Sequence, residues 1–103
     1  MSEIKTYKFK EWTCYITKTK YPNGNIRLNL MDFDDKLPVC TLTTNFTDIE
    51  ISQEEKETCI FVKDYAENEG VLQFLLDNNI VDPNIIRTYT VGYVMVPFVK
   101  VLI

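Results

Sequence analysis

The chain has 103 residues, of which 46% are hydrophobic and 13% aromatic, and a formal net charge of −4. This length and composition suit one domain with a buried core, over residues 1–103, and argue against global disorder. No apolar run approaches the roughly 18 residues of a membrane span, and the N-terminus lacks a signal-peptide pattern, so we expect a cytoplasmic protein without membrane association.

Cysteine and histidine usage argues against a metal centre and against common catalytic machinery. Cys14, Cys40 and Cys59 are widely spaced in strand-like contexts, where cysteine acts as a small hydrophobe, and histidine is absent. The sequence contains no CxxC pair, phosphate loop or nucleophile elbow, and serine or cysteine catalysis usually requires histidine. We therefore expect no metal, no cofactor and no enzymatic activity.

The first part of the chain predicts antiparallel strands. Residues 6–9 and 12–21 form two such runs, and residues 26–32 place alternate apolar side chains on one face of a third. Between the last two, Asn23-Gly24 favours a tight hairpin turn because both residues can adopt positive φ.

The middle of the chain predicts two more strands joined by polar segments. Residues 39–46 and 58–63 have strand composition, and residues 32–38 form a polar turn. Residues 47–57, with a charge run from Glu54 to Glu57, are predicted to be a solvated connection.

Residues 86–103 are apolar on both faces and predict one long strand or two short ones. Gly92 suggests a bulge, and Pro97, which lacks an N–H donor, suggests an edge or a break. The apolar end must be covered within the fold or by a second copy, so monomer and homodimer both remain open.

A helix is predicted between these strands, at about residues 65–78. Apolar residues recur there at helical spacing and define one buried stripe. They are Val71, Leu72, Leu75 and Leu76. The whole pattern predicts an α+β fold, an antiparallel β-meander sheet with this one helix packed on one face.

The acidic residues around this helix are interpreted as capping groups rather than catalytic carboxylates. Asp64 and Glu67 have the spacing of a capping box, and Asn68 is a second candidate N-cap. Asn78 and Asn79 are predicted to end the helix, because asparagine tolerates the left-handed conformation, and Ile80 can supply the closing apolar contact.

Two candidate binding surfaces arise from the N-terminal third. Alternate residues of the second strand form a face rich in tyrosine and threonine, which suits protein recognition but is equally typical of a solvent-facing strand. They are Thr13, Tyr15, Thr17, Thr19 and Tyr21.

The alternative surface is basic. Residues 1–27 carry a net charge of +4, from six basic and two acidic residues, which could attract single-stranded nucleic acid. The candidate residues are Lys8, Lys10, Lys18, Lys20 and Arg27. The remaining acidic chain would repel phosphates, so nucleic acid is the less favoured partner.

Four segments of the sequence carry a family resemblance. They are "YPNGN…LNLMD", "CTLTTN", "VKDYAENEGVL" and "GYVMVPFVK". Together they resemble a family of short uncharacterised proteins of gut bacteria and their plasmids, phages and integrative elements. The resemblance implies an accessory protein of a mobile element and names no catalytic residue. The leading hypothesis is a small non-enzymatic interaction domain that binds or modulates a host protein, with inhibition of a defence system as one version.

Overall fold

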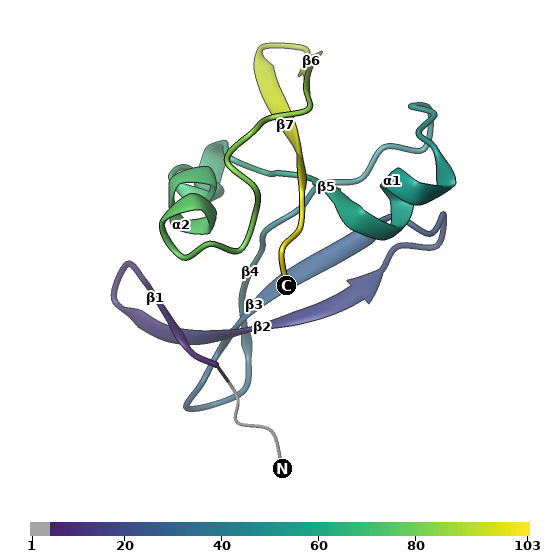
Figure 1. The fold of residues 1–103 in the computed structure, drawn as a ribbon. Coiled ribbons are helices and arrows are strands. Elements are labelled where there is room, and N and C mark those ends of the chain that lie inside the picture. The colour runs from purple at the N-terminus through teal and green to yellow at the C-terminus, as the bar shows by residue number, and fades with distance from the viewer. Residues whose placement is uncertain (1–4) are drawn as a thin grey trace.

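The structure is a computed structural model that describes residues 5–103, without the side chain of Glu67. The first half of the chain forms a four-stranded antiparallel sheet in sequential order (Figure 1). Its strands are β1 (Tyr7–Phe9), β2 (Trp12–Lys20), β3 (Ile26–Asp32) and β4 (Pro38–Thr41). This sheet is the predicted meander.

The second half forms a three-stranded antiparallel sheet and two short α-helices. The sheet order is β5 (Cys59–Phe61), β7 (Val94–Lys100), β6 (Arg87–Val91). The helices are α1 (Gln53–Thr58) and α2 (Val71–Asp77), and a 3₁₀ turn, η1 (Ala66–Asn68), precedes α2. The predicted α+β class is confirmed, although the later strands form a separate sheet instead of extending the first.

The main hydrophobic core joins both sheets. Leu28 and Leu30 of β3 and Ile60 and Val99 of the second sheet belong to one buried cluster. A smaller cluster surrounds Phe61 on the other side of the second sheet. The alternation of β3 explains its contribution, because every second side chain of a strand points to the same face.

Helix α1 corrects the prediction of a solvated connection over residues 47–57. Ser52 and Glu55 form a capping box, in which each side chain accepts a hydrogen bond from the backbone N–H of the other residue. This arrangement satisfies two backbone donors at the helix start and favours a helix even though none of its residues is buried.

The start of α2 differs from the prediction. The N-cap is Gly70, with φ 96°, whereas the side chain of Asn68 is buried and donates to the carbonyl of Thr41. Asp64 caps α2 although it lies six residues before Gly70 in the sequence. Its Oδ1 accepts hydrogen bonds from the N–H groups of Gly70 at 2.9 Å and Leu72 at 3.2 Å. The predicted reciprocal contact through the Glu67 side chain lies outside the described residues.

The end of α2 follows the prediction. Asn79 has φ 55°, its N–H donates to the carbonyl of Leu76, and the N–H of Ile80 donates to that of Leu75. This is the Schellman arrangement, and the closing Ile80 is fully buried. Val71 and Leu75 of the predicted stripe are buried, and Leu72 and Leu76 pack against the core half-buried. Phe74 joins the stripe through ring contacts with β1.

Two turns differ from the sequence interpretation. At Asn23-Gly24 only Gly24 has positive φ, and the N–H of Gly24 donates to the carbonyl of Tyr21. The loop is therefore a longer hairpin connection with Pro22 and Asn23 in its β-turn. Gly92 forms no bulge, because it lies with Tyr93 in a two-residue turn between the paired Val91 and Val94.

The final segment forms two short strands, which is one of the two predicted outcomes. Pro97 lies inside the central strand β7 and not at an edge. Its carbonyl accepts the N–H of Val62 at 2.9 Å, one residue after β5 ends. In an antiparallel strand, the N–H and C=O groups of one residue face the same neighbouring strand. The N–H that Pro97 lacks would therefore face the β5 side, at the point where β5 ends.

No helix within residues 5–103 is long and apolar enough to cross a membrane.

Candidate protein-interaction surface

The β6–β7 hairpin ends in three exposed apolar residues, Val91, Tyr93 and Met95, here together called the hairpin tip. Val91 pairs with Val94 and Met95 with Thr90, so Val91 and Met95 project from opposite faces of the hairpin. The exposed fraction is 42% for Val91 and 64% for Met95, and Tyr93 is fully exposed. Four of the five residues of β6 are also exposed. In Figure 1 this hairpin extends away from the four-stranded sheet. Exposed apolar side chains at the end of a projecting element are typical of a segment that a partner encloses.

The base of the same hairpin is firmly packed. Val96 and Phe98 are buried, and the Phe98 ring lies 4.7 Å from that of Phe61. Tyr89 meets Phe98 edge-to-face at 6.1 Å. The hairpin is therefore anchored at one end by aromatic contacts, while its tip remains open to solvent.

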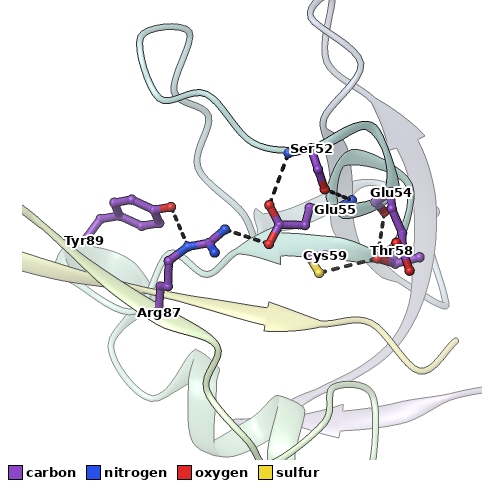
Figure 2. A network of polar contacts seen from close by, with 7 residues as sticks. All are labelled: Ser52, Glu54, Glu55, Thr58, Cys59, Arg87 and Tyr89. Atoms are coloured by element: carbon purple, nitrogen blue, oxygen red, sulfur yellow. Dashed lines mark hydrogen bonds and ion pairs between the residues drawn. The ribbon is translucent and has the colours of Figure 1, made fainter.

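A polar network also attaches this base to α1 (Figure 2). The guanidinium of Arg87 in β6 forms an ion pair with Glu55 Oε2 at 2.7 Å, and its Nε donates to the Tyr89 hydroxyl at 2.9 Å. The guanidinium also lies 4.9 Å from the centre of the Phe98 ring. A bond across 32 residues of sequence thus orients the hairpin relative to the helix.

Glu55 takes part both in the capping box of α1 and in the ion pair with Arg87. Its Oε1 accepts the N–H of Ser52, and this backbone hydrogen bond, followed by the contact with Arg87, holds the pKa of the Glu55 carboxyl below 4.5. The hydrogen bond to Glu55, followed by the one to Tyr89, raises the pKa of Arg87. Both groups are therefore charged at neutral pH, and the network persists there.

An open groove of about 510 Å³ lies beside the network. Its lining comes from α1, β5, the segment before β6 and the end of β7, and includes Glu54, Thr58, Cys59, Ile86 and Lys100. The Thr58 hydroxyl donates to the Glu54 carbonyl at 2.8 Å and lies 3.4 Å from the Cys59 sulfur. No group of three potential metal ligands occurs within residues 5–103. In Figure 2, the contacts between Ser52 and Glu55 cap α1, and those of Arg87 join the hairpin to the helix.

The predicted tyrosine and threonine face exists as one face of β2. Thr13 and Thr19 are exposed, and Tyr15 and Thr17 are half-buried. Tyr21 lies beyond the end of β2, and its hydroxyl is 3.0 Å from the Thr43 hydroxyl. The face is therefore accessible, while Tyr21 is engaged within the fold.

The predicted basic residues do not form one site. Lys8 pairs with Thr13, and Arg27 with Thr19, so both lie on the tyrosine and threonine face. Lys18 and Lys20 alternate with that face and point to the other side of β2. Lys10 lies in the turn before β2, so the basic residues extend over the length of this strand and over both faces.

Four features of this surface were not predicted from the sequence: Ser52, Glu55, Arg87 and the hairpin tip. The spacing of Ser52 and Glu55 is a readable capping-box signature, which the adjacent charge run obscured. The order Val91-Gly92-Tyr93-Val94 is likewise a readable two-residue hairpin signal. Arg87 has no local signal, because its partner is remote in sequence.

Comparisons with known proteins identify no relative. No protein-family model matches the chain. No curated protein matches it significantly, and no solved structure does.

Proposed function

We propose that this protein is a non-enzymatic interaction module that presents the hairpin tip to a partner protein. The observation that carries the proposal is the exposure of Val91, Tyr93 and Met95 on a hairpin whose base is fixed by packing and by the Arg87–Glu55 ion pair. A rigid base lowers the entropy lost on binding, and exposed tyrosine and methionine supply contact area.

A protein suits this surface better than a nucleic acid. The segment from Thr88 to Val99 contains no charged side chain, so the hairpin tip offers nothing to a phosphate backbone. The family resemblance favours a host protein of a bacterial cell as the partner, and modulation or inhibition of a defence protein as the outcome.

Capture from nuclease-treated bacterial lysate tests this proposal. The tagged protein is compared with a Tyr93→Ser, Met95→Ser double variant, and mass spectrometry identifies the captured proteins. Leu37→Ser is the matched control, because Leu37 is also an exposed apolar residue, at 61%, but lies in the loop before β4.

We expect one stoichiometric protein with the wild type and the Leu37 variant, and its loss with the double variant. Thermal unfolding of all three verifies that the fold is kept. Equal capture by the double variant, or no specific protein with the wild type, contradicts the proposal.

A further inference from the structure

Strand β2 continues well beyond its neighbour β1. Pairing with β1 covers only Trp12 to Cys14, whereas pairing with β3 runs from Cys14 to Lys20. Within residues 5–103, the stretch from Tyr15 to Lys20 therefore has a strand partner on one side only. We call this stretch the β2 edge.

The hydrogen-bond pattern shows which backbone groups face outward. The Thr13 carbonyl accepts the N–H of Phe33 at 2.9 Å, and the Tyr21 N–H donates to the Asn25 carbonyl at 2.8 Å, both toward the β3 side. Since this direction alternates along an antiparallel strand, the N–H and C=O groups of Ile16, Lys18 and Lys20 point away from β3. Such groups are a template for an added strand.

A cavity of about 380 Å³ lies at the start of this edge. It is lined by Lys5, Tyr7, Tyr15, Ile16, Thr17 and Ile103. Tyr15 and Thr17 point to one face of β2 and Ile16 to the other, so the cavity follows the edge itself rather than either face. Lys18 Nζ donates to the main-chain oxygen of Ile103 at 3.1 Å and so helps to hold the apolar wall of the cavity.

The charges around the β2 edge are basic. Lys5, which precedes β1, lines the cavity, and the exposed Lys18 and Lys20 lie further along β2. These residues belong to the +4 segment of a chain with a net charge of −4. An acidic segment is therefore attracted to the edge, whereas a second copy of this acidic chain is repelled overall.

We propose that the β2 edge binds an extended acidic segment of another protein by strand addition. An apolar side chain of that segment enters the cavity beside Ile16, and its carboxylates lie beside Lys18 and Lys20. An antiparallel segment then has the order acid, any residue, acid, any residue, apolar, because alternate side chains share a face. This site is separate from the hairpin tip and does not depend on the proposed function.

The probe is the acetylated, amidated peptide Glu-Thr-Glu-Thr-Ile-Thr, titrated into ¹⁵N-labelled protein and followed by NMR. We expect amide shifts at Ile16, Lys18 and Lys20, with slower hydrogen exchange of the same three amides in the complex. Binding should weaken at least tenfold for the charge-reversed peptide Lys-Thr-Lys-Thr-Ile-Thr. It should also weaken as salt rises.

Two further comparisons separate strand addition from charge attraction alone. A peptide N-methylated at the two glutamates and the isoleucine keeps its side chains but loses the donors that face β2, and should bind at least tenfold more weakly. Lys20→Glu should weaken the original peptide while keeping the contact between Lys18 and Ile103. The Tyr93→Ser, Met95→Ser variant should bind the peptide like the wild type.

Three outcomes overturn the proposal. The first is the absence of shifts at the edge, and the second is equal binding of the N-methylated peptide. The third is protection of the Ile16, Lys18 and Lys20 amides in the free protein. Protection that changes with protein concentration would identify a second copy as the occupant, and protection that is lost when Met1–Ile4 are removed would identify the chain's own N-terminus.

Discussion

Glu55 shows how one carboxylate contributes to stability through two separate contacts. In the folded protein, the pKa of Glu55 lies below its ordinary value of 4.5. The stabilisation that the Glu55 carboxylate contributes is therefore fully present above pH 4.5 and is lost as the pH falls through the lowered pKa. Acidification therefore weakens both the start of α1 and its ion pair with Arg87.

Substitutions at Glu55 separate these two contributions. Glu55→Gln keeps a capping acceptor and removes the charge, so we expect a loss of less than about 1 kcal/mol at pH 7. Glu55→Ala removes the capping acceptor as well, and its loss should reach about 1–2 kcal/mol. Urea unfolding between pH 7 and pH 3 measures both, with Glu54→Gln as the control for a like charge on the same helix. An unchanged pH dependence in Glu55→Gln would contradict this account.

At the residue scale, what can be predicted depends on sequence distance. The Asn79 and Ile80 end of α2 was predicted because all its partners lie within five residues. The Ser52 and Glu55 pair was equally local and could have been predicted. The Arg87 contact could not, because only the folded chain brings β6 beside α1 (Figure 2).

At the element scale, the start of α2 requires a left-handed backbone conformation at its N-cap residue, Gly70. Gly70 has φ 96° and ψ −4°, and a Cβ built there meets no atom within 4 Å. Any effect of adding a side chain therefore comes from the left-handed backbone and not from a steric clash.

We expect Gly70→Ala to destabilise the protein by about 1–2 kcal/mol, which is the cost of this conformation for an L-residue. Gly70→Asn should lose less, because asparagine tolerates positive φ and is also a good N-cap. Both variants keep the N–H that Asp64 accepts. Equal losses for the two variants, measured by urea unfolding, would show that the conformation is not the cause.

The predictions of helices and strands were wrong mainly about where an element begins and which neighbour it pairs with. Residues 12–21 and 26–32 were placed well because alternation reports a buried face directly. The predicted helix start was wrong, since Asp64 caps a turn six residues later rather than the adjacent one. The unpaired β2 edge was invisible in sequence, because the length of β1 has no signature in β2.

At the scale of the whole molecule, the two sheets should unfold together. Their residues form one buried cluster, and the segments that follow β4 and β5 are further linked where Thr43 pairs with Val62. Removing either sheet would expose the core side of the other, so partial unfolding is costly.

Two probes on different sheets test this cooperativity. Trp12, the one tryptophan, reports the first sheet by fluorescence, and alkylation of Cys59 in β5, located by mass spectrometry, reports the second. We expect both to change at the same urea concentration. Exposure of Cys59 before the fluorescence change would show that the sheets unfold separately.

The other two cysteines provide internal controls for the labelling. Cys14 is fully buried, and burial together with the nearby Asp32 raises the pKa of its thiol, so it should react only on unfolding. Cys40 is half-buried and should react at a lower urea concentration than Cys14 and Cys59.

The α+β class, the meander of the first four strands, the apolar stripe of α2 and its closing turn could all be predicted from the order of the residues. These features depend on periodicity and on neighbours close in the chain, which local chemistry specifies. The separation into two sheets, the Arg87–Glu55 contact, the projecting hairpin tip and the open β2 edge became visible only in the folded chain. They depend on which distant segments meet and which remain uncovered, and long-range packing decides this.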